Sequence, residues 1–231
     1  MDKIVNAVAK NLDLSQNRPI KELIYEALRK TVILGDIPAG VRINEKYFSE
    51  MMNISRTPIR YALKRLADED LVIRKPGIGV IVKGISVKDA YEIYAIRKEL
   101  DALATRQAMR LMTTAEFEQL NQLLLETRRL NEAGDVTAVL QKFSEFNQFI
   151  YDKSQMYRLK SIVVELQEYL VYFRDICIRS TDRCDLALAE HWLIYRGMLN
   201  QDINQINLIT HEHLDHSLDF IVKEMRHRHL E

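Results

Sequence analysis

The stretch of sequence that decides the fold reads Ser55-Arg56-Thr57-Pro58-Ile59-Arg60-Tyr61-Ala62-Leu63-Lys64-Arg65-Leu66. It predicts a helix that begins after Ser55, whose hydroxyl can accept a backbone N–H of the first turn. Pro58 falls inside that first turn, where its missing N–H costs no helical hydrogen bond. Apolar side chains recur at helical spacing and predict one buried face, made by Ile59, Ala62, Leu63 and Leu66.

Basic side chains form a second stripe on the same helix. Arg56, Arg60 and Lys64 are spaced four residues apart, and at 100° per residue this stripe centres roughly 130° from the apolar one. An arginine in the first turns of a helix suits the DNA major groove, where guanidinium can fork onto guanine or clamp a phosphate. The alternative is a basic face that contacts only solvent.

Two further helices are predicted before this one. The first carries apolar residues at helical spacing over residues 20–32 and ends at Gly35. Asn44 is predicted to cap a short second helix, which connects through Asn53-Ile54 to the basic helix. So short a connection is typical of a helix-turn-helix.

A β-hairpin is predicted after the three helices. Leu71–Arg74 and Val80–Lys83 are apolar runs typical of strands, and Lys75–Gly79 between them supplies a turn. A basic tip with two glycines can approach a phosphate backbone or enter a minor groove. An ordinary surface hairpin is the alternative, but three helices followed by two strands favour a winged helix-turn-helix.

Composition divides the chain into two parts. The 231 residues are long enough for two domains, and 47% hydrophobic residues with only 7 Gly and 4 Pro favour a folded, largely helical protein. Residues 1–84 carry 15 Lys and Arg against 10 Asp and Glu, whereas residues 85–231 carry 18 against 23. We therefore expect only the first part to meet a polyanion.

Cysteine content and hydropathy indicate the compartment. Cys177 and Cys184 are the only cysteines, too few for a disulfide framework. No run approaches 18 apolar residues, and the first residues lack the profile of a signal peptide. We expect a cytoplasmic protein with no membrane partner.

The N-terminal part resembles the GntR family of bacterial transcription regulators. The resemblance covers residues 19–83 nearly without gaps and rests on Leu34–Gly40, Asn44-Glu45, Ser55–Leu63 and Gly77–Gly79. It implies that operator DNA is contacted by the basic helix, by one position of the helix before it and by the wing, at Arg56, Thr57, Arg60, Lys46 and Gly77. To these the basic stripe adds Lys64, and the start of the helix adds Ser55.

Residues 85–231 predict six antiparallel helices with short connections, a bundle able to enclose a pocket. A polar loop is expected over Arg179–Arg183, between the fourth helix and the fifth. The bundle is similar to the effector domain of the FadR-like branch of the GntR family. That resemblance rests on Arg97 with an acid four residues on, on Glu190-His191 followed by Asp202, and on His213.

Arg97 lies on an apolar stripe of the first bundle helix, formed with Ala90, Ile93, Leu100 and Ala104. A buried guanidinium is costly unless it is paired. One reading is an ion pair with Asp101, four residues later, or with a neighbouring helix. The other is a clamp for a carboxylate or phosphate ligand, which the bidentate fork of arginine suits.

Three more polar side chains lie on apolar stripes of later helices: Asn147, His191 and His213. Each alone is typical of a core residue whose hydrogen bonds are satisfied. Together with Arg97 they favour a polar pocket. The predicted effector site is therefore Arg97, Asp101, Asn147, His191 and His213.

The resemblance also implies a metal. Many FadR-like domains hold a divalent ion with an Asp and a His four residues later on the third bundle helix, plus two further His. The last two match His191 and His213, but the first pair falls on Phe143 and Asn147. Two imidazoles and a carboxamide make an incomplete ligand set. We expect, at most, weak binding of Zn²⁺ or Ni²⁺ through His191 and His213.

The sequence thus predicts a mostly α protein, with an N-terminal arm over residues 1–18, a winged helix-turn-helix over 19–84 and an all-α antiparallel bundle over 85–231. We expect a homodimeric, metabolite-responsive bacterial transcription regulator, not an enzyme. It would bind palindromic double-stranded operator DNA and be switched by a small anionic ligand, most simply a carboxylate. One alternative is a metal-dependent enzyme fused to a DNA-binding module. Another is an architectural DNA-binding protein whose bundle only dimerises.

Overall fold

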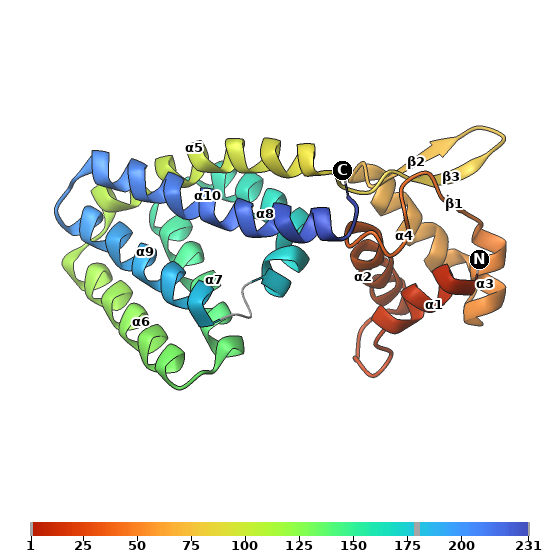
Figure 1. Cartoon of the computed structure of the whole chain (residues 1–231), viewed down its shortest axis with the longest axis horizontal. Coiled ribbons are helices and arrows are strands. Elements are labelled where there is room, and N and C mark those ends of the chain that lie inside the picture. Colours follow the sequence, from red (N-terminus) through yellow and green to blue (C-terminus); the bar gives the residue numbers. More distant parts are fainter. Residues whose placement is uncertain (1, 178–180, 231) are drawn as a thin grey trace. The chain divides into compact units, whose positions relative to one another are not determined.

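The computed structural model of the chain, shown in Figure 1, describes residues 2–177 and 181–230. The chain divides into two compact units, Met1–Val87 with Met225–Glu231, and Lys88–Glu224. The first unit contains helices α1–α4 and a small sheet, and the second is helical, which confirms the predicted fold class. Across the described residues, no helix combines the length and apolar composition that crossing a bilayer requires.

The first unit is a winged helix-turn-helix preceded by one more helix. Its helices are α1 (Asp2–Asn11), α2 (Ile20–Ile33), α3 (Glu45–Met52) and α4 (Arg56–Asp68). Its strands are β1 (Arg42–Ile43), β2 (Val72–Lys75) and β3 (Gly79–Val82), in the antiparallel order β1-β3-β2. The strand β1 was not predicted, because two residues are too few to show an alternating pattern.

Packing of α4 on α2 makes the centre of this unit. Ile59, Ala62, Leu63 and Leu66 are each 0% exposed, as the apolar stripe predicted. A polar frame borders that contact, in which Tyr61 Oη and Arg65 donate to the two carboxylate oxygens of Glu22, each at 2.7 Å. With one face of α4 fixed in this way, its basic stripe is turned to the surface.

The expected N-terminal arm contains a helix. Helix α1 buries Val5 and Val8, and Asn11 Nδ2 donates to Thr31 Oγ1 of α2 at 3.0 Å. A helix of 10 residues is marginal in isolation, so packing of its apolar face against α2 accounts for its stability. The contacts therefore join α1 to the winged helix-turn-helix.

The two predicted N-caps differ in the structure. Asn44 caps α3 as expected, and its side chain accepts from the backbone N–H groups of Lys46 (3.0 Å) and Tyr47 (3.1 Å). Ser55 occupies the N-cap position of α4 with φ −60° and ψ 159°, but its hydroxyl makes no capping hydrogen bond. The capping role predicted for Ser55 is therefore wrong, although the helix begins where it was expected.

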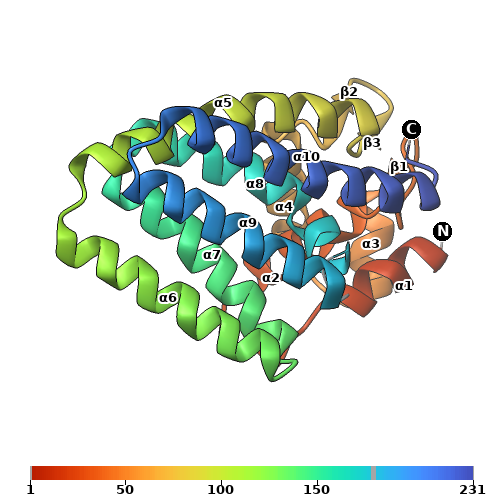
Figure 2. The ribbon, with the colours of Figure 1, turned by 60° about the vertical axis from the view of Figure 1, so that its left-hand side comes forward.

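The second unit is the predicted bundle of antiparallel helices (Figure 2). These are α5 (Val87–Leu111), α6 (Thr114–Glu132), α7 (Val136–Lys153), α8 (Tyr157–Cys177), α9 (Thr181–Leu199) and α10 (Ile203–His227), of which α5 begins and α10 ends in the first unit. Helix α6 lies against α7 and α9, and α7 packs on α8. Of the polar loop expected over Arg179–Arg183, residues 179–180 lie outside the described residues. Helix α9 begins at Thr181, so Arg183 is helical.

Substitution of the α3 cap tests how far this local bond stabilises the first unit. Asn44→Ala removes the acceptor for two first-turn N–H groups and should lower the free energy of unfolding by about 1 kcal/mol. Ser55→Ala, at the matched position of α4, should change it by no more than a few tenths because no capping bond is lost. Urea unfolding followed by circular dichroism measures both, and equal losses would contradict this assignment.

Candidate functional site

The first candidate site is the exposed face of α4. Arg56, Thr57, Arg60 and Lys64 are all exposed, and the Arg60 side chain retains 64% of its accessible surface. A groove of about 550 Å³ runs along this face, lined by Thr57, Arg60, Tyr61, Lys64, Ala67, Asp68 and Arg74. Three of the predicted DNA contacts therefore share one open surface with an arginine of the wing.

The remaining predicted contacts flank α4 in sequence and lie in the same unit. Lys46 is exposed in the first turn of α3, where it pairs loosely with Glu50 at 3.7 Å. Ser55 is exposed at the start of α4. Gly77 forms the tip of the hairpin with φ +74°, a left-handed conformation that glycine adopts without strain.

Sequence reasoning missed two residues of this surface, Arg74 and Glu45. Arg74 lies on β2 opposite Val80 and borders the same groove as Arg60. The carboxylate of Glu45 lies 3.4 Å from Arg60 Nε and 3.8 Å from Arg74 Nη1. The basic pair Arg74-Lys75 at the end of the strand was a visible signal for Arg74. Glu45 is part of the stretch Asn44-Glu45 that carries the family resemblance, but its position there indicated no contact with the arginines.

The second candidate site is a small enclosed cavity in the bundle, of about 40 Å³. Its walls come from α7, α8, α9 and α10, and its lining is Leu140, Phe143, Asn147, Arg174, Arg183, Ala187, His191, His213 and Ser217. Three of the five residues predicted for the effector site are therefore brought together, namely Asn147, His191 and His213. Arg97 and Asp101 do not line this cavity.

Arg97 and Asp101 form the ion pair that was one of the two readings of the sequence. Arg97 Nη2 donates to Asp101 at 3.1 Å, and the other carboxylate oxygen accepts from Tyr151 Oη at 2.8 Å. Gln167 donates to Tyr151 Oη at 2.9 Å, which extends the network from α5 through α7 to α8. Burial opposes the charge on Arg97, but the Asp101 carboxylate outweighs it and raises the pKa of Arg97.

Two cations line the cavity, Arg174 and Arg183. Arg174 pairs with Asp175 at 3.0 Å, and Arg183 is the more buried of the two. The side chain of Arg183 is 3% exposed; its Nη2 donates to Ser217 Oγ at 2.7 Å, and its Nη1 is buried with no hydrogen-bond partner in the part of the chain that the structure describes. The nearest carboxylate is Glu190, 3.6 Å from Nη1. The sequence did not reveal Arg183 because it was assigned to a loop. Within α9, Arg183, Ala187 and His191 follow at helical i, i+4 spacing and share one face.

Glu190 holds two histidines. Its carboxylate oxygens lie 2.6 Å from His213 Nδ1 and 2.6 Å from His216 Nδ1. Burial acts to raise the pKa of Glu190, but these hydrogen bonds and the charge of Arg183 prevail and hold it below its usual value. The sequence placed His213 at the site without this partner, which comes from the neighbouring helix.

His191 has an aromatic environment and no polar partner. Its ring stacks on Phe146 at 4.3 Å and lies perpendicular to the ring of Phe143 at 4.8 Å, measured between ring centroids. Both ring nitrogens are buried without a hydrogen-bond partner. Burial, with the nearby His213 and Arg183, lowers the pKa of His191 well below its usual value. His191 is therefore neutral in the folded protein near pH 7.

The donor set does not fit a tightly held divalent metal. Phe143 places an aromatic ring against His191 where the FadR-like pattern has a carboxylate, and Asn147 offers only a carboxamide. His213 already uses Nδ1 with Glu190. Among the described residues, no group of three or more His, Cys, Asp and Glu side chains is arranged to hold a metal ion. The two imidazoles that remain make a weak site.

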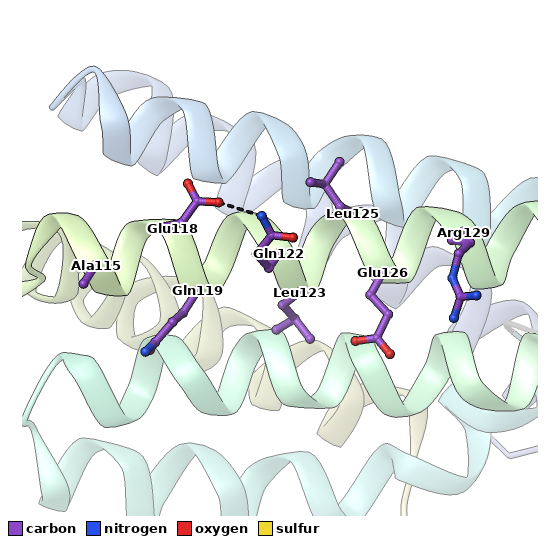
Figure 3. Close-up of a pocket in the computed structure, with 8 residues that line it drawn as sticks. All are labelled: Ala115, Glu118, Gln119, Gln122, Leu123, Leu125, Glu126 and Arg129. Carbon is purple, nitrogen blue, oxygen red and sulfur yellow. Dashed lines mark hydrogen bonds between the residues drawn. The ribbon is translucent and has the colours of Figure 1, made fainter.

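A larger but open groove, of about 640 Å³, lies on α6 (Figure 3). Its lining side chains all come from that one helix: Ala115, Glu118, Gln119, Gln122, Leu123, Leu125, Glu126 and Arg129. The one hydrogen bond among them joins Gln122 to Glu118 at 2.6 Å, along the helix. The groove brings no polar groups from different elements to one point, so it is a weaker site candidate than the cavity.

A winged helix-turn-helix with a basic recognition helix, followed by a separate helical domain, defines a DNA-binding transcription regulator. Comparison with known families agrees. A model described as "Bacterial regulatory proteins, gntR family" matches residues 20–82, and the FCD domain model matches residues 92–216, more than half of the chain. The chain belongs to the GntR family of transcription regulators and carries an FCD domain.

Relatives of known sequence span most of the chain. It is 25% identical over 214 residues to the uncharacterized HTH-type transcriptional regulator YdhC of Bacillus subtilis (strain 168), which covers 89% of this chain and 96% of YdhC. It is 23% identical over 201 residues to the HTH-type transcriptional repressor RspR of Escherichia coli (strain K12), covering 87% and 88% respectively. The solved structure of E. coli McbR/YncC has the same fold, with a TM-score of 0.61 at 20% identity over 89% of this chain and 98% of that one.

The buried neutral His191 predicts a pH dependence of stability. Its pKa is lowered in the folded state, so the unfolded chain binds the extra proton. Stability should therefore fall as the pH drops below about 6.5, the value of a free histidine. His191→Phe should lose less stability than the parent between pH 7 and pH 5.5, measured by urea unfolding. The same change at His227, exposed in the last turn of α10, should follow the parent, and a parent-like slope in His191→Phe would contradict the prediction.

Proposed function

We propose that this protein regulates transcription as a homodimer that binds a palindromic operator and is switched by a small carboxylate bound in the FCD domain. The observation that supports a ligand is the buried Arg183, which lines the cavity and whose Nη1 has no hydrogen-bond partner among the described residues. A buried guanidinium nitrogen without a hydrogen bond is costly, and an anion that accepts from it removes that cost.

The DNA half of the proposal is supported by charge and exposure. Four basic side chains, Arg56, Arg60, Lys64 and Arg74, are exposed on α4 and β2 of a unit whose sequence carries an excess of positive charge. Arginines on the first turns of α4 suit base edges, whereas Lys46 on α3 suits a phosphate. A two-fold dimer of such units matches two half-sites about one helical turn, or a multiple of it, apart.

Arg183 is a better clamp for the ligand than Arg97. Among the described residues each guanidinium keeps one buried nitrogen without a hydrogen-bond partner, Nε of Arg97 and Nη1 of Arg183. Arg97 nevertheless donates to the Asp101 carboxylate at 3.1 Å, whereas Arg183 donates only to a hydroxyl and lies 3.6 Å from a carboxylate. Asn147 and His213 line the same cavity and supply further hydrogen-bonding groups. We expect a metal to add little, since the donor set fits none well.

The cavity size limits the ligand. About 40 Å³ has room for a few water molecules and corresponds to a closed form. A monocarboxylate of a few carbons needs the smallest rearrangement of the lining. A ligand that favours the rearranged form would alter DNA affinity by a coupling free energy of about 1–3 kcal/mol.

The small volume of the bundle cavity is also compatible with the alternative of an architectural DNA-binding protein without an effector. A bundle that only dimerises would keep its cavity closed and respond to no small molecule. The ligand experiment below separates the two, because only the regulator gains stability from a carboxylate.

The DNA proposal predicts distinct losses for two kinds of contact. Arg56→Ala and Arg60→Ala should each weaken binding to a selected operator duplex by about 1–3 kcal/mol, since each removes a base-reading fork. Lys46→Ala should weaken specific and non-specific DNA alike and make the salt dependence shallower. Fluorescence anisotropy at several salt concentrations measures both effects, and parent-like affinity in both arginine variants would refute the assignment.

The effector proposal predicts which arginine matters. In a thermal-shift screen of mono-, di- and tricarboxylates, with chloride and phosphate as ionic controls, at least one carboxylate should raise the melting temperature of the parent. Arg183→Met should abolish that shift, and Arg97→Met should lower the melting temperature yet retain the shift. Loss of the melting-temperature shift in Arg97→Met alone would mean that Arg97, and not Arg183, binds the carboxylate. No shift in the parent would favour the architectural alternative.

A further inference from the structure

A carboxylate lies between two arginines on the DNA-facing side of the first unit. Glu45, in the first turn of α3, has one oxygen 3.4 Å from Arg60 Nε of α4 and the other 3.8 Å from Arg74 Nη1 of β2. Its side chain is 26% exposed, whereas those of Arg60 and Arg74 are 64% and 46% exposed. One acid thus contacts both the recognition helix and the wing.

The position of Glu45 is fixed by its own helix. Asn44 caps α3 and fixes the backbone of its first turn by accepting from the N–H groups of Lys46 and Tyr47. A negative side chain such as that of Glu45 is favoured at this end of a helix. The two arginines are the long, mobile partners. Ion pairs this exposed are weak, so DNA can displace them.

The geometry leaves the reading atoms of Arg60 free. Glu45 contacts Nε of Arg60, so the two terminal nitrogens remain available to fork onto guanine O6 and N7. Holding the side chain in that orientation before binding reduces the entropy lost when the complex forms. On DNA without the matching guanine, the guanidinium of Arg60 finds acceptors only on a phosphate. To reach the phosphate it must leave Glu45, whose carboxylate then lies unpaired beside the negatively charged DNA backbone.

We propose that Glu45 is a specificity-determining residue, which positions Arg60 and Arg74 for base reading and penalises binding to non-matching DNA. It acts through the arginines and does not itself contact a base. The inference rests on the proposed DNA-binding function. It predicts that Glu45 lowers non-specific affinity more than it lowers operator affinity.

The test compares Glu45→Gln with the parent on two duplexes of equal length and composition. One is selected from a randomised library by the parent protein, and the other is a scrambled version of it. Glu45→Gln should bind the scrambled duplex more tightly, with a salt slope steeper by about one, and the ratio of the two affinities should fall about tenfold. An unchanged ratio would overturn the proposal.

Two matched variants separate position from charge. Glu50→Gln removes the same charge from the same helix, at a residue that pairs with Lys46 and contacts neither arginine; its ratio should stay within about twofold of the parent. Glu45→Asp keeps the charge but withdraws the carboxylate, and its ratio should fall. A fall in Glu50→Gln equal to that in Glu45→Gln would reduce the effect to net charge and overturn the proposal.

A double variant tests whether Glu45 acts through Arg60. In an Arg60→Ala background, Glu45→Gln should lower the ratio by much less than it does in the parent, because the residue that Glu45 positions is gone. An equal effect in both backgrounds would overturn the positioning role. If the parent selects no sequence from the library, the proposed function itself fails. If it selects one and Glu45→Gln discriminates like the parent, only this inference fails.

Discussion

Burial of one face of α4 against α2 is the constraint on which the DNA-binding surface depends. Ile59, Ala62, Leu63 and Leu66 have no exposed surface, and each removes apolar area from water that would otherwise oppose folding. The Glu22 bonds to Tyr61 and Arg65 fix the rotation of α4 about its own axis. Since the helix cannot turn, its basic stripe has only one direction to face.

The helical unit follows a different rule, the compensation of buried charge. Asp101 neutralises Arg97 and orients Tyr151, and Glu190 holds His213 and His216. These pairs join α5 to α7 and α9 to α10, so they determine packing as much as charge. Arg183 is less completely compensated, because its nearest carboxylate is 3.6 Å away and is shared with two histidines. That imbalance, more than the cavity volume, distinguishes the site from an ordinary core.

How far the sequence predicted these features depends on whether a feature is local. The helices and the basic stripe follow from helical periodicity, which neighbouring residues encode. The capping hydrogen bond predicted for Ser55 is absent because the residue type shows only that a hydroxyl can accept a backbone N–H, and not how the side chain is oriented. Arg97 could not be assigned between core and ligand, since its partner Asp101 is also bonded to Tyr151, which lies 50 residues after Asp101 on another helix. Arg183 was missed because it lies at the end of the polar run Arg179–Arg183, which is typical of a loop, whereas α9 already begins at Thr181.

Both candidate sites contain an internal carboxylate beside the cations that an anionic partner would use. Glu45 contacts Arg60 and Arg74, and Glu190 approaches Arg183. In each case an incoming anion must compete with a group that is already present at high effective concentration. Such competition lowers affinity for every anion, but least for a partner that satisfies the arginine without separating it from its acid. The same arrangement therefore favours discrimination over tight binding at the DNA surface and in the bundle.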